Sequence, residues 1–356
     1  MRHVIIMAGG TGGHVYPALA TAKELISRGY TVSWLGTPDS FESRLVPQHK
    51  IEFDVVNIKG LRGNGVKRML TAPFLLSQSL LQALSVMRRR KPVLVIGMGG
   101  FASGPGGVAA RLTGTPLVIH EQNAIAGVTN KLLSKFSNAV CEAFPGTFRA
   151  SKKVTTTGNP VRAEIAALAP PAERMSQHNG PVQVLVVGGS LGAAMLNEVV
   201  PEALALIDEA QRPAIGHQSG RNKEQETLQA YEDAGVKSWV VEFIDDMAEA
   251  YSWADLMICR SGALTVSELA AAGVASILVP YPFAVDDHQT LNARYLADQG
   301  AAVILQQRDM NAAVLAQKIR NLDRDRLLHM AQKARLLARS DATSQVVDIC
   351  ERVMMR

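Results

Sequence analysis

The feature that most limits how this chain can fold is a repeated succession of a short apolar run, a glycine-rich turn and a helical stretch. Parallel strands need a crossover of a dozen or more residues, usually a helix, so this succession predicts parallel sheets covered by helices. We expect strands at 3–8, 31–35, 53–58, 93–96, 117–119 and 139–141, and again at 182–187, 214–217, 239–242, 256–259, 276–279 and 303–305.

The succession breaks once, at residues 166–181, where Ala, Pro and polar residues replace the apolar runs, and we interpret this segment as a linker or domain edge. A chain of 356 residues is long enough for two domains, each with its own core. We therefore predict two similar α/β domains, 1–162 and 163–341, with a cleft between them. The last helical stretch, 342–356, is followed by no strand and is expected to pack back on the first domain.

The charge is distributed unevenly along the chain. The formal net charge of +5 divides into +13 for residues 1–162 and −8 for the rest. Between Asp54 and Glu121 there is no acidic residue and there are nine basic ones. A basic face predicts an anionic partner, which can be nucleic acid, anionic lipid or phosphates. No nucleic-acid-binding motif accompanies the charge, so we expect no nucleic acid partner.

One basic and apolar stretch, 62–91, has the pattern of an amphipathic helix. Such a helix can lie on an anionic membrane surface. The alternative is a crossover helix that buries its leucines on the sheet, and both can hold. The N-terminus runs straight into a strand without the apolar stretch of a signal peptide, so we expect a cytoplasmic protein. The apolar positions are Leu70, Phe74, Leu81 and Leu84, and the basic flanks are Lys67, Arg68 and Arg88–Lys91.

Two glycine loops follow predicted strands in the first half. Residues 9–13 precede His14 and a helical stretch, an arrangement in which backbone N–H groups can approach a phosphate. Val15 stands where a dinucleotide-binding fingerprint needs glycine, so NAD is disfavoured. The sequence contains no GxxxxGK[ST], which argues against a Walker-type NTPase. The second loop, 97–107, has six glycines, and helix–sheet packing explains only some of them.

The third loop, 188–193, spells GxSxG in a strand–turn–helix context, which is also the nucleophile elbow of α/β-hydrolases. An acid and a histidine follow in the order that a hydrolase needs, at Asp286, Asp287 and His288. A hydrolase would leave the first two glycine loops and the duplicated domain plan unexplained. The polar cluster 286–292 is a site candidate in its own right, because it follows a predicted strand and turn.

Residues 261–269 read as a strand end that enters a helix. The N–H groups of the first turn can hold a diphosphate, and Glu268 can accept both hydroxyls of a ribose. The alternative is an ordinary capping box, with Ser261 or Thr265 as N-cap and Glu268 as its partner. The local pattern favours neither.

Five motifs in this order resemble the MurG family of bacterial glycosyltransferases: 10–14, 120–123 followed by 126–127, 158–162, 188–193 and 263–268. The resemblance implies a GT-B fold, that is, two Rossmann-like domains with the donor nucleotide mainly in the C-terminal one and the acceptor in the N-terminal one. It implies that GlcNAc moves from UDP-GlcNAc to the C4 hydroxyl of MurNAc in lipid I, with inversion, to give lipid II for peptidoglycan. It also implies a peripheral protein on the cytoplasmic face of the bacterial inner membrane, with lipid I, an anionic membrane surface and cell-wall synthesis proteins as partners.

The resemblance also implies roles for particular residues of the second domain. Glu268 would hold the ribose hydroxyls, the backbone of Ile244 would meet the uracil, and Gln289 would read the GlcNAc hydroxyls. Asn123 would reach the donor from the first domain. The residues expected at UDP-GlcNAc, mainly near its diphosphate, are Thr11, Gly12, Gly13, Arg162, Ser190, Ala263, Leu264, Thr265, Val266 and Ser267.

His14 is the leading candidate for the general base, because an imidazole near neutral pKa suits proton removal from a hydroxyl. A phosphate contact to the acceptor is its alternative role, and Glu121 is the alternative base. The acceptor loop is expected to use Gly99, Gly100, Phe101 and Ser103; Phe101 replaces the Tyr common in the family, so packing on the sugar is expected there.

No cofactor and no metal are expected. The DxD spelling Asp323-Arg324-Asp325 falls in a charged helical stretch, 321–339, that we interpret as a solvated face. The alternative functions are a UDP-sugar epimerase or hydrolase, another GT-B glycolipid glycosyltransferase, and a nucleotide-sugar binding module without catalysis.

Overall fold

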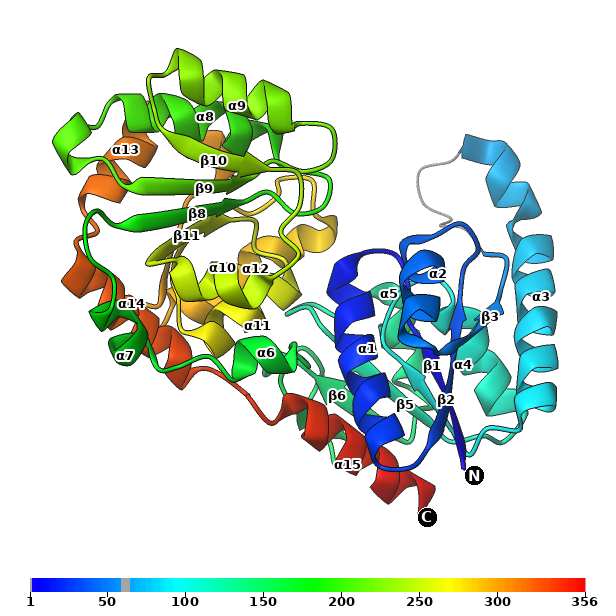
Figure 1. Ribbon diagram of the computed structural model, residues 1–356. Coiled ribbons are helices and arrows are strands. Elements are labelled where there is room, and N and C mark those ends of the chain that lie inside the picture. Colours follow the sequence, from blue (N-terminus) through cyan, green and yellow to red (C-terminus); the bar gives the residue numbers. More distant parts are fainter. Residues whose placement is uncertain (1, 59–64, 356) are drawn as a thin grey trace. The chain divides into compact units, whose positions relative to one another are not determined.

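The computed structural model describes the backbone of residues 2–58 and 65–355 and the side chains of 2–58 and 73–355. The chain divides into two compact units: unit 1 is Met1–Arg162 with Ser340–Arg356, and unit 2 is Ala163–Arg339. Each unit contains a parallel sheet with helices on both faces (Figure 1). All twelve predicted strands overlap observed ones, so the predicted fold class is confirmed.

Unit 1 contains, in its described part, a seven-stranded sheet in the order β3-β2-β1-β4-β5-β6-β7. The edge strand β7 was not predicted, because three residues, Val-Thr-Thr, are too short to give a periodic pattern. The strands are β1 His3–Met7, β2 Thr31–Gly36, β3 Glu52–Val55, β4 Leu94–Gly97, β5 Leu117–Glu121, β6 Ala139–Glu142 and β7 Val154–Thr156. The helices are α1 Gly12–Ser27, α2 Phe41–Leu45, α3 Gly65–Arg90, α4 Ser103–Leu112, α5 Val128–Leu133 and α15 Ala342–Met354.

Unit 2 has a six-stranded sheet in the order β10-β9-β8-β11-β12-β13. The strands are β8 Gln183–Val187, β9 Ala214–Gln218, β10 Ser238–Val241, β11 Leu256–Cys259, β12 Ala275–Leu278 and β13 Ala302–Ile304. The helices are α6 Ala163–Ala166, α7 Pro171–Ser176, α8 Ala194–Ala205, α9 Glu224–Asp233, α10 Met247–Trp253, α11 Ala263–Ala272, α12 His288–Ala297, α13 Ala312–Arg320 and α14 Arg324–Leu336.

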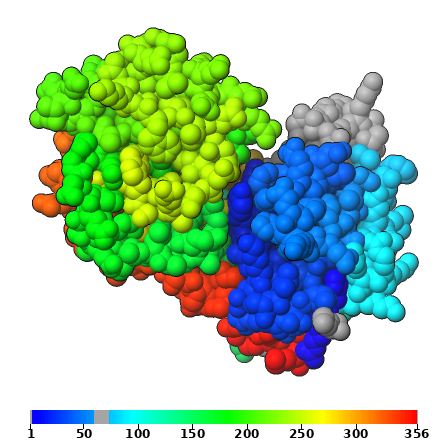
Figure 2. Space-filling view, in the orientation of Figure 1, coloured from blue at the N-terminus to red at the C-terminus, as the bar shows by residue number. Residues whose placement is uncertain are grey.

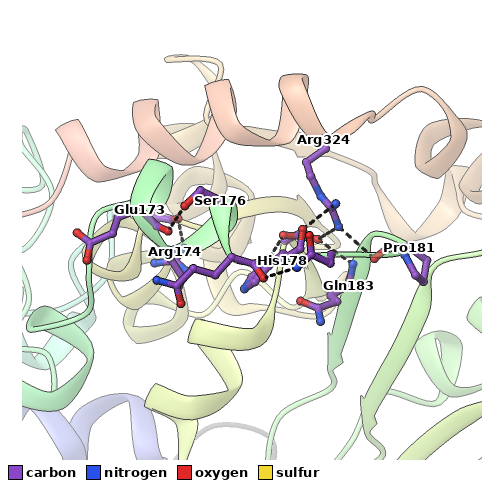
Figure 3. Close-up of polar contacts among 11 residues, drawn as sticks. Glu173, Arg174, Ser176, His178, Pro181, Gln183 and Arg324 are labelled. Carbon is purple, nitrogen blue, oxygen red and sulfur yellow. Dashed lines mark hydrogen bonds and ion pairs between the residues drawn. The ribbon is translucent and has the colours of Figure 1, made fainter.

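The segment expected to be a linker, 166–181, contains α7 and packs into unit 2 against α14. Arg174 of α7 is buried, and its guanidinium donates to the carbonyl oxygens of Ala272 and Gly273 at 2.8 and 2.7 Å (Figure 3). These carbonyls end α11, where orphan acceptors need donors. Composition alone suggested a linker because it does not reveal that a charged side chain satisfies a helix end.

The last helix, α15, packs on α1 of unit 1. Its apolar side, with Val346, Val347 and Cys350, is buried in the core beneath the sheet. On the outer side Arg28 donates to Asp348 at 2.6 Å and to Glu351 at 2.9 Å. The chain therefore leaves unit 1 after Arg162 and returns to it at its C-terminal end.

Helix α3 buries one face and exposes another. Ala83, Val86 and Met87 lie in the core, whereas Phe74 and Leu81 are 73% and 67% exposed. In the space-filling view the cyan α3 atoms form an outer edge of unit 1 (Figure 2). The crossover-helix interpretation is therefore confirmed for the buried side chains, and the membrane-surface interpretation of the exposed ones stays a prediction. Arg62 and the side chains of Lys67, Arg68 and Leu70 lie outside the described residues.

Two basic residues at the end of α3 form ion pairs within the fold, which the sequence did not indicate. Arg89 and Arg90 donate to the buried carboxylate of Asp54, at 2.6 and 2.9 Å. Burial raises the pKa of Asp54, but the hydrogen bonds and charge of Arg90 and Arg89 outweigh it and hold this pKa below its usual value. Among the described residues, no helix is long and apolar enough to cross a bilayer.

Candidate functional site

The first two glycine loops meet at the carboxyl ends of β1 and β4, which are neighbours in the sheet. A Cβ on Gly100 would lie 2.6 Å from the backbone nitrogen of Gly9 and 2.5 Å from its carbonyl oxygen. Gly100 also has φ +83°, in the left-handed region that favours glycine. The excess of glycine in the second loop is therefore explained in part by this crossing of two backbones.

His14 is the third residue of α1, and its half-buried imidazole lies against Gly99. A Cβ on Gly99 would be 2.9 Å from Nε2 of His14. Arg162 lies in the same unit, and its guanidinium carbon is 5.3 Å from the ring centroid of Tyr16, which follows His14 by two residues in α1. The structure thus brings His14 together with the acceptor-loop glycines. Thr11, Gly12 and Gly13 form the N-cap and first turn of the same helix.

Glu42 is a residue of this site that sequence reasoning missed. It is buried and accepts the N–H of Gly10 at 3.2 Å through Oε2. Through Oε1 it accepts the N–H and hydroxyl of Thr37 at 3.2 and 2.7 Å. Burial raises the pKa of Glu42, but these hydrogen bonds lower it more, to below its usual value. A carboxylate of the chain itself therefore occupies one amide of the first loop, which disfavours a nucleotide phosphate at that amide.

Glu121 is buried and accepts four hydrogen bonds. Oε1 takes the backbone N–H of Asn123 at 3.1 Å and its side-chain Nδ2 at 3.3 Å, and Oε2 takes Gly127 N–H at 3.0 Å and Asn130 Nδ2 at 2.9 Å. A carboxylate has about four lone-pair sites, so four donors leave little room for a substrate hydroxyl to hydrogen-bond to it. The arrangement orders the turn after β5, which presents the half-buried Asn123.

The rest of the acceptor loop separates into exposed and internal parts. Phe101 is 53% exposed, as packing on a sugar requires. Ser103 is fully buried, and its hydroxyl donates to the carbonyl oxygens of Gly99 and Met7 at 2.7 and 3.1 Å. Its hydroxyl therefore holds the loop rather than facing a ligand, contrary to the expectation from sequence.

In unit 2, the loop 188–193 lies at the carboxyl end of β8 and leads into α8. The carbonyl oxygen of Ser190 accepts the N–H of Arg221 at 3.4 Å. No hydrogen bond among the described side chains joins Ser190 to His288; Nδ1 of His288 instead donates to the Val285 carbonyl at 2.8 Å. Asp287 accepts the hydroxyl of Thr290 at 2.7 Å. The hydrolase alternative therefore lacks its triad here.

The N-terminus of α11 is capped by Gly262, without a side-chain hydrogen bond, so the capping-box alternative is wrong. Glu268 is buried on this ten-residue helix, where Oε2 accepts the hydroxyl of Tyr251 at 3.2 Å. Ser267 donates its hydroxyl back to Ala263 O at 2.9 Å. What the first turn offers a ligand is therefore mainly the backbone amides of Ala263, Leu264 and Thr265, since the side chains of Leu264 and Val266 are buried.

Gln289 is the second residue of α12, and its Oε1 accepts the N–H of Tyr281 at 2.9 Å. Arg260, which sequence reasoning missed, lies 5.6 Å from the ring centroid of Tyr281 and donates to the Val279 carbonyl at 3.1 Å. Its place directly after β11 was the available signal. Ile244 follows β10 and is half-buried, and among the described residues its backbone makes no hydrogen bond.

The DxD sequence Asp323-Arg324-Asp325 lies at the start of α14, near the amino ends of the unit 2 strands β8 and β11. Asp323 is the N-cap of α14, with Oδ1 accepting Arg326 N–H at 2.9 Å, so the motif begins the helix instead of lying inside it. Arg324 donates to the buried Asp255 at 3.3 Å and to the carbonyl of His178 at 3.0 Å (Figure 3). In the part of the chain that the structure describes, no three His, Cys, Asp or Glu side chains are grouped to hold a metal ion.

Named relatives and a solved crystal structure are similar to this chain over nearly its whole length. A protein from Pseudomonas putida, named UDP-N-acetylglucosamine--N-acetylmuramyl-(pentapeptide) pyrophosphoryl-undecaprenol N-acetylglucosamine transferase, is 54% identical over 354 residues, which cover 98% of this chain and 97% of the relative. A relative of the same name from Pseudomonas savastanoi pv. phaseolicola is 51% identical over 99% of this chain and 98% of its own length. The crystal structure of Acinetobacter baumannii MurG matches with a TM-score of 0.86 and 49% identity, over 99% of this chain and all of that one.

The chain belongs to the MurG family. Models of the glycosyltransferase family 28 N-terminal and C-terminal domains match residues 4–142 and 183–353. The GT-B class expected from the resemblance is thereby confirmed, with one Rossmann-like sheet in each unit. Within this family, the residues described above are the candidates for donor and acceptor contacts.

Proposed function

We propose that this chain transfers GlcNAc from UDP-GlcNAc to the C4 hydroxyl of MurNAc in lipid I and so forms lipid II for peptidoglycan. The observation that carries the proposal is the identity of 51–54%, over nearly the whole chain, with relatives whose names state a UDP-GlcNAc-dependent transfer to an undecaprenol-linked muramyl pentapeptide. The absence of a hydrolase triad among the described residues and the buried, preoriented Glu268 support it over the alternatives.

Unit 2 is proposed to bind the donor. The open amides at the start of α11 suit a diphosphate, because four N–H groups at a helix start lack intrahelical partners and carry partial positive charge. Glu268 lies farther along the same helix, and the hydroxyl of Tyr251 fixes its carboxylate. A diphosphate on the helix start and a ribose on Glu268 therefore fit one nucleotide. Ser190, Ile244 and Gln289 are the further donor residues of this proposal.

Unit 1 is proposed to bind the acceptor and to supply the base. His14 is favoured over Glu121, because Glu121 is buried and already accepts four hydrogen bonds. In an inverting displacement the base takes the proton of the C4 hydroxyl while its oxygen attacks the anomeric carbon and the bond to UDP breaks. The partial positive charge at the start of α11 and the charge of Arg162 would stabilise the departing diphosphate.

We also propose that unit 1 lies on the cytoplasmic face of the bacterial inner membrane, where the lipid acceptor is anchored. Helices α3, α4 and α5 pack side by side. The exposed large apolar side chains described on them are Phe74, Leu75, Leu76, Leu81, Val108, Leu112, Val128 and Leu132. Exposed cations with no ion pair among the described residues accompany them: Arg88, Lys91, Arg111, Lys131 and Lys135.

A cavity of about 420 Å³ lined by Arg111, Lys135 and Asn138 lies at the same surface. Each cation near an anionic surface adds about 1 kcal/mol, so reversing two of them should weaken binding strongly. The double variant Arg111→Glu, Lys135→Glu should bind vesicles containing phosphatidylglycerol much more weakly than the wild type. The double variant Lys237→Glu, Arg308→Glu, at two exposed residues of unit 2, is the control, because it changes the net charge by the same amount. Equal binding by all three proteins would refute the membrane surface.

The function itself is tested by incubating the protein with radiolabelled UDP-GlcNAc and a short-chain lipid I analogue. We expect a labelled disaccharide lipid with a β-1,4 linkage. Label released as free sugar would indicate a hydrolase, an altered UDP-sugar would indicate an epimerase, and binding without turnover would indicate a binding module. Each of these three results would contradict the proposal.

Two variants test the residue roles. Glu268→Gln keeps the shape of the side chain and removes the carboxylate that accepts ribose hydroxyls, so UDP should bind at least about tenfold more weakly. His14→Gln should lower kcat by about 10²–10⁴ while leaving UDP affinity near that of the wild type. A His14→Gln enzyme with normal turnover would exclude His14 as the base, and Glu121→Gln would then be the next variant to measure.

A further inference from the structure

We propose that His217 is a positioning residue for donor binding: through Asn197 it fixes the carbonyl of Ser219, on which the loop 188–193 rests. This inference goes beyond the donor residues named above, and it relies on the proposed role of that loop. His217 is the second-to-last residue of β9, a strand to which the sequence motifs assigned no function.

The buried chain of hydrogen bonds has three links. Nδ1 of the fully buried His217 is 2.8 Å from the hydroxyl of Tyr231, and Nε2 is 3.1 Å from Oδ1 of Asn197. The amide nitrogen of Asn197 donates to the carbonyl of Ser219 at 3.1 Å. An amide oxygen only accepts, so Nε2 carries the proton and Nδ1 accepts the Tyr231 hydroxyl. Burial lowers the pKa of His217 to about 3, which keeps the ring neutral and this pattern intact at neutral pH.

The Ser219 carbonyl is in contact with the proposed donor loop. A Cβ on Gly192 would lie 2.1 Å from this oxygen, and Gly192 has φ +70°. A Cβ on the neighbouring Gly220 would lie 2.2 Å from the nitrogen of Gly192. One residue farther on, the N–H of Arg221 donates to Ser190 O at 3.4 Å. The two loops thus touch backbone to backbone, and a shift of Ser219 must move Ser190 or open the contact.

Asn197 also ties this network to α8, the helix that the donor loop opens. It lies on the first turn of α8, and its N–H donates to the carbonyl of Ala193 at 3.0 Å. Asn197 therefore holds Ser219 through its side-chain amide and is bonded to the end of the donor loop through its backbone N–H. His217, Tyr231 and Ser219 are fully buried and Asn197 is 7% exposed, so we infer that the network acts on a ligand through the loop.

Two substitutions of His217 separate this role from a general contribution to stability. Gln places a donor nitrogen close to the position of Nε2, so His217→Gln keeps the link to Asn197 and loses the acceptor for Tyr231. Asn reaches only the Nδ1 position, so His217→Asn loses the link to Asn197. We expect His217→Asn to raise KM for UDP-GlcNAc and Kd for UDP about tenfold, which corresponds to about 1.4 kcal/mol, with KM for the lipid I analogue unchanged and kcat within about threefold. His217→Gln should stay within about twofold of wild type.

The control is His178→Asn. His178 is a mostly buried histidine of the same unit, and its Nδ1 lies 2.6 Å from Asp255 near the amino ends of β8 and β11, away from the loop (Figure 3). This variant should lower Tm and leave KM for UDP-GlcNAc unchanged. If both His217 variants and the control lower Tm while the donor KM of all three equals that of the wild type, the positioning role is wrong.

A third variant, Tyr231→Phe, decides the question if His217→Asn does not fold. It removes only the hydroxyl that fixes the tautomer of His217, and we expect a rise of about threefold in donor KM. An unchanged donor KM would overturn the role of the network. Failure of the underlying function looks different: if Ser190→Leu leaves donor KM and UDP binding unchanged, the loop does not contact the donor at all, whatever the His217 variants do.

Discussion

The crossing of the two glycine loops in unit 1 can be tested with one methyl group. In Gly100→Ala the new Cβ would lie 2.5 Å from the carbonyl oxygen of Gly9, whereas real Cβ contacts stay beyond about 3.0 Å, so one loop must move by at least 0.5 Å. The substitution also places alanine at φ +83°. Gly29→Ala is the matched control, because Gly29 has φ +87° and no atom within 4 Å of its Cβ position.

The two variants share the left-handed backbone penalty and differ in the clash. The penalty is about 1 kcal/mol for each. Overpacking against a backbone that cannot yield adds about 1–3 kcal/mol, so Gly100→Ala should be destabilised by about 2–4 kcal/mol in total. For a unit of this size, 1 kcal/mol changes Tm by about 2–4 °C. We therefore expect a fall of about 2–4 °C for Gly29→Ala and about 4–16 °C for Gly100→Ala.

Activity provides the second readout, because the imidazole of His14 lies against Gly99, beside the clash. A misplacement of a base by a fraction of an ångström to 1 Å can cost about 10- to 100-fold in rate. Scanning calorimetry and the radiolabel transfer assay on both full-length variants test this. Equal Tm values for the two variants, or normal turnover by Gly100→Ala, would refute the crossing of the loops and its link to His14.

Three further predictions concern buried groups. Arg90→Gln removes hydrogen bonds to buried Asp54, so it should lower the free energy of unfolding in urea at pH 7 by about 1–3 kcal/mol. The control Arg88→Gln changes an exposed residue that has no ion pair with the described side chains, and it should have no effect. The folded pKa of Asp54 is lowered, so its stabilisation is present above about pH 4 and should disappear as pH falls further; an Arg90→Gln deficit that persists at pH 2.5 would contradict this. Burial lowers the pKa of His120 to about 4. The unfolded chain therefore binds this proton more readily, and the free energy of unfolding should decrease as the pH falls from about 6.5 to about 4. A free energy of unfolding that stays constant over this range would count against a neutral buried His120. Burial raises the pKa of Cys141 to about 12, so a thiol reagent at pH 8 should label it only after urea is added; rapid labelling of the native protein would disprove its burial.

Much of the architecture was predictable because it depends on local patterns. The short apolar runs and glycine turns located all twelve strands to within a few residues, since each buried parallel strand must be apolar along most of its length. The strand β7 escaped because it is a three-residue edge strand. The charge of the first half was visible in the sequence, but the sequence could not reveal that Arg89 and Arg90 use their charge on Asp54, 35 and 36 residues away.

Only some residues of the candidate site could be predicted from the sequence. Spacing alone indicated that His14 stands at a helix start and Glu268 in the second turn of a helix, each helix following a strand end, because those positions follow from the order of elements. Glu42 could not be recognised, since its link to Gly10 spans 32 residues and no motif marks it. For Glu121 the sequence could indicate only a carboxylate able to act as a base, because its four hydrogen-bond donors come together only in the folded chain.

The sequence by itself thus determined the two parallel sheets, the glycine turns at their carboxyl ends and, through ordered motifs, the family. Periodicity and turn chemistry act over a few residues, which is why they can be read from one chain. The tertiary structure decided which polar groups are already satisfied within the protein and which face a ligand. That distinction depends on burial and on partners such as Ser219 for Asn197 or Tyr251 for Glu268, which only folding brings within hydrogen-bond distance.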